Sequence, residues 1–266
     1  MSKSYSNRLP QLDGGLFLTD GGIETTLIFL DGIDLPYFAA FDLMKTEDGR
    51  AALTRYYERY IAIALSDGTG FIFESPTWRA SSDWGALLGY SRDDIAAVNR
   101  DAIALMRELQ AKHDASRLSM VVSGCVGPRG DGYDPGQMMS PDEAESYHTH
   151  QIGAFADAKA DMVTAITMTN ANEAIGITRA AMKAGMPVPL PTGQSLADAI
   201  AEVDEATGAG PVYYMINCAH PNHFMSALPA GENWAKRVRG LRCNASKRSH
   251  QELNDSPDLD AGDPIE

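Results

Sequence analysis

The sequence has few cysteines, a shortage of basic residues and no long apolar run. Its three cysteines, Cys125, Cys218 and Cys243, are widely spaced and odd in number, which fits reduced thiols better than a disulfide framework. Lysine and arginine total 22 against 36 aspartates and glutamates and do not cluster, so we expect neither nucleic acid nor an anionic membrane as a partner. Without a run of about 18 apolar residues or a signal-peptide pattern, we expect a cytoplasmic protein.

Several common nucleotide-binding and hydrolase motifs are also missing. The sequence contains no Gly-x-Gly-x-x-Gly fingerprint, no Walker loop and no Gly-x-Ser-x-Gly elbow. Nucleotide binding and serine hydrolysis are therefore disfavoured as functions.

Short apolar segments alternate with helix-forming segments along most of the chain. Strands are expected at 16–19, 70–73, 120–122, 162–166, 212–216 and 238–241, and helices at 49–66, 91–113, 140–160 and 172–184. Ser91, with Asp94 three residues later, is a candidate N-cap for the second helix. The alternation predicts an α/β fold, a TIM-type (β/α)8 barrel, in one domain over residues 1–266.

Two segments depart from the barrel pattern. Pro187, Pro189 and Pro191 stand where a fifth strand is due, and proline cannot donate hydrogen bonds in a central strand. Residues 246–266 are polar and acidic and offer no further apolar strand, although a closed barrel needs an eighth. We therefore expect an incomplete barrel whose fifth strand is disrupted and whose eighth strand is missing, truncated at the C-terminus.

Polar residues follow the expected strands, at the end where barrel enzymes build their sites. Asp20 precedes Gly21 and Gly22, which suits the binding of an amine, although the same tripeptide is common in turns. Cys218 and His220 are residue types that bind zinc. A small, buried, unreactive thiol is the alternative for Cys218.

Three further groups have open roles. Glu74 is either a general base or ligand at the mouth of the barrel, or a loop carboxylate with local partners. The sulfur of Cys243 would approach Cys218 if the last two strands are neighbours, but we expect Cys243 to pack in the core. His148 and His150 do not share a helix face, so they receive no catalytic role.

Four sequence features together resemble the homocysteine S-methyltransferase family: 18–27 (LTDGGIETTL), 123–131 (SGCVGPRGD), Tyr147-His148 with Gln151, and Asn217-Cys218. Their order and spacing match the family over nearly the whole chain. The resemblance implies a zinc-binding (β/α)8 barrel that moves a methyl group from a small donor to the thiol of homocysteine, giving methionine. Betaine, S-methylmethionine, S-adenosylmethionine and methylcobalamin serve similar barrels, so the donor stays open.

The resemblance also assigns roles to individual residues. Cys218 falls on a zinc ligand, and Asp20 falls on a residue that helps to bind the amino acid. The residues expected to hold or surround the substrate are Asp20, Gly21, Gly22, Glu74, Thr77 and Asn217. In two respects the sequence departs from the family: the Gly-Gly-Cys-Cys run that supplies two more zinc ligands is absent, and Ile166 replaces a glutamate.

Three functional hypotheses follow from these observations. The chain is an inactive, shortened family member, or it is an active enzyme that uses Glu74 without the zinc ligand set and accepts an altered substrate. The third hypothesis is a noncatalytic module that binds small molecules or assembles through an open sheet edge, which would allow a homo-oligomer.

Overall fold

The computed structural model shows a mixed α/β fold built on parallel strands. It describes residues 5, 8–116, 118–132, 136, 138–188, 196–228, 231–248, 252 and 258–263. Four strands pair in the order β1-β2-β3-β4, and β5 pairs with β6 in a second parallel sheet. The strands are β1 (Phe17–Thr19), β2 (Gly70–Glu74), β3 (Met120–Val126), β4 (Met162–Ala165), β5 (Tyr214–Asn217) and β6 (Val238–Arg242). All six overlap the strands predicted from the sequence.

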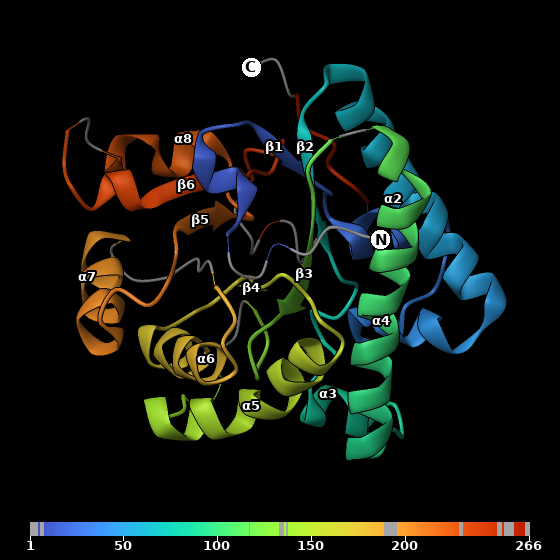
Figure 1. Ribbon diagram of the computed structural model, residues 1–266, viewed down its shortest axis with the longest axis horizontal. Coiled ribbons are helices and arrows are strands. Elements are labelled where there is room, and N and C mark those ends of the chain that lie inside the picture. The colour runs from blue at the N-terminus through green and yellow to red at the C-terminus, as the bar shows by residue number, and fades with distance from the viewer. Residues whose placement is uncertain are drawn as a thin grey trace.

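Helices follow most of the strands and lie around their outside (Figure 1). The α-helices are α1 (Ile23–Thr25), α2 (Glu47–Asp67), α3 (Ser82–Leu87), α4 (Arg92–Lys112), α5 (Pro141–Asp157), α6 (Ala171–Lys183), α7 (Leu196–Thr207) and α8 (Pro221–Phe224). Shorter helical segments are Pro10–Asp13, Thr26–Leu30, Pro36–Phe38, Ala40–Lys45, Asp114–Ser116, Met225–Ala227 and Ala235–Arg237. The four predicted helices are confirmed as α2, α4, α5 and α6, whereas α1, α3, α7 and α8 were not predicted.

Local capping explains where the two best-predicted helices begin. The Ser91 hydroxyl accepts a hydrogen bond from the Asp94 backbone, and the Asp94 carboxylate accepts one from the Ser91 backbone, so the predicted N-cap is confirmed as a full capping box. Ser140 and Glu143 form the same reciprocal pair at the start of α5. Each box satisfies amide groups that the first helical turn leaves without partners.

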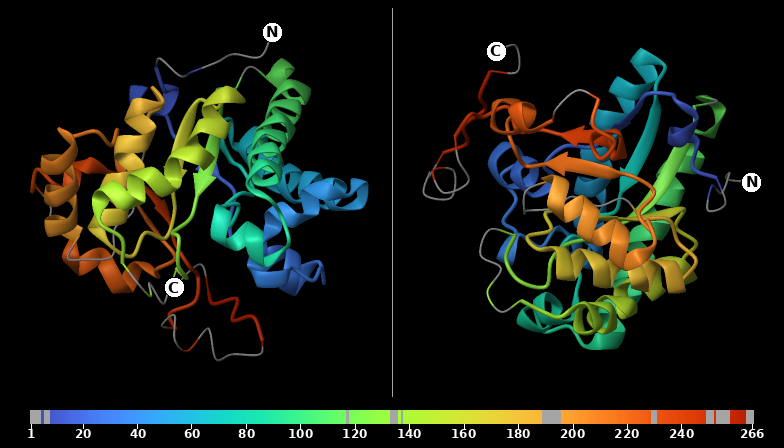
Figure 2. Two further views of the ribbon diagram at one scale, coloured as in Figure 1. Left: turned by 90° about the horizontal axis from the view of Figure 1, so that it is seen from below. Right: turned by 90° about the vertical axis from the view of Figure 1, so that its left-hand side faces the viewer.

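The segment between β4 and β5 links the two sheets through backbone hydrogen bonds. The Val163 amide donates to the carbonyl of Pro187, and the Val212 amide donates to the carbonyl of Val188. Residues 187 and 188 thus lie between β4 and the segment that leads into β5, with the Pro187 carbonyl serving as an acceptor. The rest of the predicted disruption, which includes Pro189 and Pro191, lies outside the described residues. In Figure 2 (right), β5 and β6 run side by side above α7 and α6.

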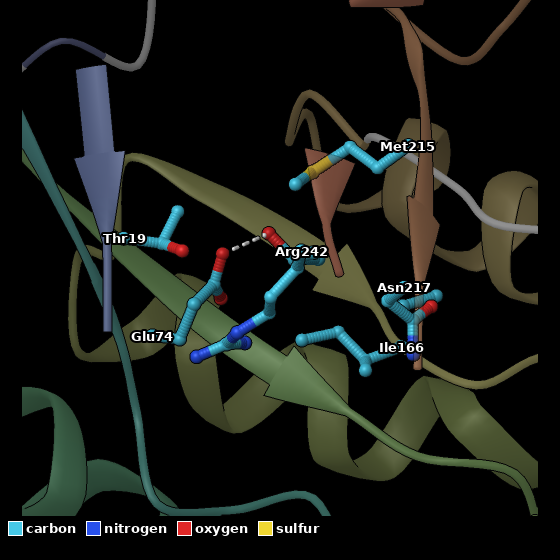
Figure 3. A pocket seen from close by; sticks show the side chains of 8 residues that line it. Thr19, Glu74, Ile166, Met215, Asn217 and Arg242 are labelled. Atoms are coloured by element: carbon cyan, nitrogen blue, oxygen red, sulfur yellow. Dashed lines mark hydrogen bonds between the residues drawn. The ribbon is translucent and has the colours of Figure 1, made fainter. Parts of the chain in front are cut away.

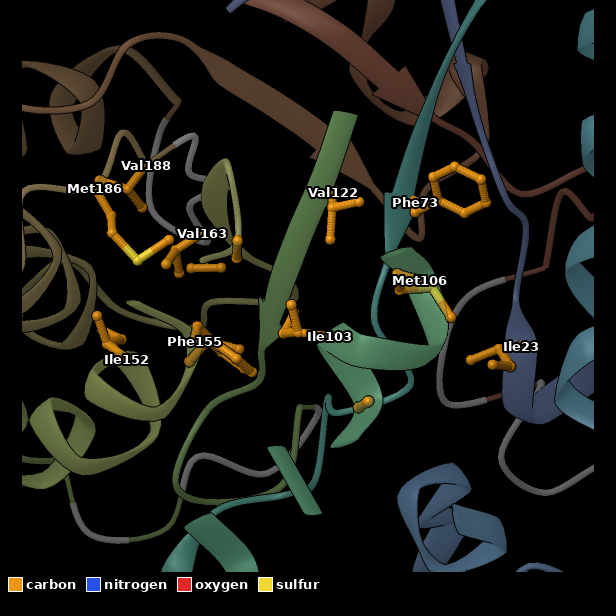
Figure 4. Packing of buried hydrophobic residues seen from close by; sticks show 14 of the residues in the cluster. Ile23, Phe73, Ile103, Met106, Val122, Ile152, Phe155, Val163, Met186 and Val188 are labelled. Carbon is orange, nitrogen blue, oxygen red and sulfur yellow. The ribbon is translucent and has the colours of Figure 1, made fainter. Parts of the chain in front are cut away.

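The main hydrophobic core lies between the first sheet and its outer helices. Every residue of β3 is buried, and Phe155 of α5 belongs to this core (Figure 4). A Cβ atom on Gly124 of β3 would come within 2.3 Å of the Phe155 ring. Likewise, a Cβ atom on Gly176 of α6 would come within 2.4 Å of Ala144, at the contact between α5 and α6. These close approaches fix the helices against the strands whose ends carry the polar residues. Among the described residues, no helix has the length and apolar character needed to cross a membrane.

Candidate functional site

A small pocket lies where the carboxyl ends of the strands meet. Because all six strands run parallel to their neighbours, the residues that end them face the same edge of the molecule. The pocket is lined by Thr19, Glu74, Thr164, Ala165, Ile166, Met215, Asn217 and Arg242. Figure 3 shows the Arg242 guanidinium extending from β6 toward Glu74, with Ile166 and Asn217 on the other side. Two of the sequence-predicted site residues, Glu74 and Asn217, therefore share one pocket.

Asp20, directly after β1, is buried and fully engaged by protein donors. Its Oδ1 accepts a hydrogen bond of 2.5 Å from Nη2 of Arg242, and its Oδ2 accepts one of 2.9 Å from the Tyr56 hydroxyl. Burial raises the pKa of Asp20, while the positive charge of Arg242 and the Tyr56 hydroxyl act in the opposite direction. Arg242 thus joins the ends of β6 and β1, and sequence analysis had given this arginine no role.

Gly21 contributes its backbone to the same contact. The Gly21 carbonyl accepts a hydrogen bond of 2.8 Å from Nη2 of Arg242. A Cβ atom on Gly21 would come within 2.5 Å of the Tyr60 hydroxyl. A side chain at Gly21 would therefore displace either Tyr60 or the backbone that holds Arg242. Gly22 is exposed and is the N-cap residue of α1.

Glu74, the last residue of β2, presents one free carboxyl oxygen. Its Oε1 accepts a hydrogen bond of 2.9 Å from the Thr164 hydroxyl, which is itself 2.7 Å from the Ser123 hydroxyl. Its buried Oε2 has no hydrogen-bond partner within the described part of the chain. Burial raises the pKa of Glu74 to about 7, although the nearby charge of Arg242 lowers it. Glu74 is thus a buried carboxyl group that gains or loses its proton near neutral pH.

Glu24 is a second carboxyl group near this site that sequence analysis missed. Burial raises the pKa of Glu24 to about 7, with Arg242 lowering it and Asp20 raising it. Its position inside the 18–27 segment was the available signal, but the sequence does not show that Glu24 lies within reach of the charges of Arg242 and Asp20.

Asn217 orients the sulfur of Cys218. The Asn217 Nδ2 donates to the Cys218 sulfur at 3.0 Å and to the Thr167 hydroxyl at 3.1 Å, while its Oδ1 accepts from the Thr167 backbone. Cys218 and Thr167 both have positive φ angles, of 56° and 62°. Non-glycine residues in this conformation are uncommon and cluster at functional sites. The amide thus holds two strained turns together, one after β4 and one after β5.

The described residues do not by themselves form a zinc site. Zinc in proteins takes at least three protein ligands, and no cluster of three His, Cys, Asp or Glu side chains suited to a metal occurs within the described ranges. Cys218 is half-buried, and the prediction that Cys243 packs in the core is wrong, because Cys243 is exposed. Side chains along β6 alternate between half-buried and exposed, which carries Cys243 to the outer face. His220 is buried, and its Nδ1 accepts from the Asn222 amide.

Thr77 lies behind the pocket instead of lining it. It is fully buried, and its hydroxyl donates to the Cys125 carbonyl at 2.7 Å and lies 2.7 Å from the Ser75 hydroxyl. Gln151 of α5 donates to the Thr77 carbonyl at 2.9 Å. These contacts hold the loop after β2 against β3.

The Tyr147-His148-Gln151 feature of the sequence forms a buried support for the loops. His148 is fully buried and lies 2.9 Å from Oε1 of Glu173, which also accepts from the Arg129 amide at 2.7 Å. The Tyr147 hydroxyl donates to Ser81 at 3.0 Å. The feature therefore positions the loops after β2 and β3 from the side of α5.

Comparisons with known proteins agree with this architecture. Residues 17–260 match the family model described as homocysteine S-methyltransferase. Crystal structures of the homocysteine methyltransferase MmuM from Escherichia coli are similar in fold. The metallated form has a TM-score of 0.67 at 20% sequence identity, and the match covers 88% of this chain and 93% of that chain. The oxidized form has a TM-score of 0.69 at 18% sequence identity, and the match covers 87% of this chain and 93% of that chain. No curated protein sequence matches the chain.

Proposed function

Because this chain belongs to the homocysteine S-methyltransferase family, we propose that it transfers a methyl group from a small donor to the thiol of homocysteine or a closely related thiol. The observation that carries the proposal is the pocket at the strand ends. There the charged groups of Glu74 and Arg242 lie on one side, and Asn217 beside Cys218 lies on the other. This division parallels the polar end and the sulfur end of homocysteine.

The proposed reaction is a direct displacement. The thiolate sulfur forms a bond to the methyl carbon, and the bond from that carbon to the donor breaks with its electron pair going to the donor. A thiol with an ordinary pKa near 8.5 is partly ionised in mildly alkaline buffer, which takes up the proton. Asn217 contributes by orienting Cys218, since its amide donates to the Cys218 sulfur and to the Thr167 hydroxyl.

The pocket is proposed to lie at the mouth of a TIM-type barrel in a cytoplasmic enzyme that yields methionine. Support for the barrel comes from the hydrogen bonds through Pro187 and Val188, and from the pair formed by Asp20 and Arg242, which joins the first and last strands of the described part. The family resemblance assigns zinc to Cys218. Since the described residues do not complete a site for zinc, no step of the proposed reaction is assigned to the metal.

The proposal is tested by incubating the full chain with homocysteine and each of four donors, namely betaine, S-methylmethionine, S-adenosylmethionine and methylcobalamin. Methionine is quantified by mass spectrometry, with and without added zinc. We expect methionine with one donor and a large loss of rate in Asn217→Ala, because that change removes the donor that orients the Cys218 sulfur. Arg239→Ala, exposed on β6, serves as the matched control and should keep the wild-type rate.

A folded protein that binds homocysteine but forms no methionine with any donor would contradict the proposed reaction. That result would favour the noncatalytic binding module among the hypotheses raised from the sequence. Light scattering on the same sample would then test for assembly through a sheet edge.

A further inference from the structure

The pocket at the strand ends is closed in the structure. Its cavity volume is about 10 Å³, which is room for roughly one water molecule. The neighbouring strands β2, β3 and β4 are fixed by their ladder hydrogen bonds, so space for a larger molecule has to come from the loops that follow the strands. The contacts that hold these loops together therefore control access to the pocket.

Arg79, in the loop after β2, joins the loops that follow β1 and β3. Its Nη1 donates to the Tyr37 carbonyl at 2.7 Å, and its Nη2 donates to Oδ2 of Asp131 at 2.7 Å. Its guanidinium carbon lies 3.9 Å from the ring centre of Trp84 and 4.8 Å from that of Trp78. Because the residue is only 8% exposed, these cation–π and charged contacts are shielded from water. Three loops thus meet at one guanidinium.

Trp78 connects this junction to the wall of the pocket. Its indole Nε1 donates to the carbonyl of Ile166, which lines the pocket, at 3.2 Å. A Cβ atom on Gly132 would come within 2.9 Å of the Thr167 side chain and 3.2 Å of the Trp78 ring. The Thr167 hydroxyl accepts from Asn217, another lining residue. The loops after β2, β3 and β4 are therefore packed closely together beside the pocket.

The loop after β1 is strained where it reaches the junction. Tyr37 and Phe38 have φ angles of 56° and 53°, in the left-handed region that non-glycine residues adopt rarely. Both rings are exposed, so burial does not offset the strain. Such a conformation persists only where surrounding contacts hold it, and the hydrogen bond from Arg79 to the Tyr37 carbonyl is one of them. Loss of Arg79 should let this segment relax away from the other loops.

We propose that Arg79 is a positioning residue for methyl transfer, which holds the loops after β1, β2 and β3 closed beside the pocket until substrate enters. In the part of the chain that the structure describes, Arg79 does not line the pocket, so it acts through Tyr37 and Trp78. The closure rests on the contacts of Arg79. Its consequence for methyl transfer rests on the proposed function.

The three cysteines allow a test of the closure that needs no methyl donor. Cys243 is exposed, Cys218 is half-buried beside Asn217, and Cys125 is buried. The full chain is treated with iodoacetamide, and the labelling rate of each cysteine is measured by peptide mass spectrometry. In Arg79→Met we expect Cys218 to be labelled about tenfold faster, the scale of one charged hydrogen bond lost from the closed state. Cys243 and Cys125 should keep their wild-type rates.

Two further variants complete the comparison. Arg79→Lys retains the charge beside Asp131 but lacks the planar fork that also reaches Tyr37, so it should accelerate Cys218 by a smaller factor. It carries the same comparison if Arg79→Met fails to fold. Arg179→Met, which removes an ion-paired arginine from α6, is the matched control and should leave all three rates unchanged.

The buried thiol separates local opening from a general loss of stability. If the Arg79 variants accelerate Cys218 and Cys125 by the same factor, Arg79 only stabilises the fold and the proposal is overturned. Unchanged labelling of Cys218 in folded Arg79→Met would overturn it as well. Because no methyl transfer is measured, a failure of the proposed reaction leaves this result intact.

Discussion

Nη2 of Arg242 lies 2.5 Å from Oδ1 of Asp20, across 222 residues of sequence. The pair is largely enclosed, since the Asp20 side chain is 2% exposed and the Arg242 side chain 16%. Besides Arg242, the Tyr56 hydroxyl donates to the Asp20 carboxylate, whereas the Thr19 hydroxyl donates to the Asp20 backbone carbonyl. The arginine is therefore both a lining residue of the pocket and the charge partner of a buried carboxylate.

Removing the arginine should destabilise the fold. Arg242→Met leaves the buried Asp20 carboxyl without its countercharge, and we expect the free energy of unfolding to fall by about 3 kcal/mol. The double variant with Asp20→Asn and Arg242→Met should lose less free energy of unfolding than the two single variants lose together. Urea denaturation measures both effects. Arg239→Met on the same strand should stay within about 0.5 kcal/mol of the wild type, and a loss there equal to that of Arg242→Met would contradict the assignment.

Stability should depend on pH through Glu74. Burial raises its pKa from 4.5 to about 7, so the folded state holds a proton that the unfolded state has released over this interval. The stabilisation that comes from protonated Glu74 is fully present below pH 4.5 and is lost as the pH rises through 7. Glu74→Gln cannot ionise, and its stability relative to the wild type should rise by up to about 3 kcal/mol across the interval. Thermal melts at several pH values check this.

The same melts on Asp101→Asn, an exposed residue of α4, provide the control for removing a carboxylate. Its stability should run parallel to that of the wild type across the interval. If Glu74→Gln also runs parallel to the wild type, the buried carboxyl does not titrate as described.

Zinc content should be well below one ion per chain after dialysis of the 266-residue protein. A tetrahedral zinc site needs three or more protein ligands, and within the described ranges Cys218 has no two further donors grouped around it. Elemental analysis of the wild type and Cys218→Ala makes the measurement, and the two should agree. One zinc per chain, lost in Cys218→Ala, would mean that ligands outside the described residues complete the site.

Two glycines should respond to alanine in opposite directions. At Gly176 a Cβ atom would come within 2.4 Å of Ala144 and 2.5 Å of the Glu145 backbone nitrogen, so Gly176→Ala should push α6 from α5 and cost about 2 kcal/mol. At Gly153, in α5, a Cβ atom would meet nothing within 4 Å. Gly153→Ala should therefore stabilise the fold by about 0.5 to 1 kcal/mol through helix propensity. Equal effects in urea denaturation would show that the α5–α6 contact is looser than described.

The strands and the long helices were predictable because local chemistry specifies them. The pair of Ser91 and Asp94 predicts the start of α4. The apolar run at 120–122 predicts β3, although that strand continues to Val126. The Asn217-Cys218 pair was correctly placed at the end of β5, since polar residues directly follow its apolar run. Each of these signals lies within a few residues of the feature that it predicts.

The pocket could be predicted only in part, because its decisive contacts join distant segments. Nothing near Arg242 in the sequence indicates that it meets Asp20, and the free oxygen of Glu74 depends on how Thr164 orients the carboxyl group. The prediction that Cys243 packs in the core was wrong because it assumed a strand covered on both faces. In the structure, β6 alternates between half-buried and exposed residues. Burial on each face is set by the neighbours of a strand, which its own sequence does not contain.

The long separation between Asp20 and Arg242 bears on when the pocket forms during synthesis. The strands β1 to β4 and their helices can pair while the ribosome is still adding residues. Each of these strands pairs with the strand before it in the sequence, which has by then been synthesised. Arg242 emerges only after most of the chain has been translated, and bringing it to Asp20 closes a loop of 222 residues. We therefore expect this pocket to be completed late in synthesis.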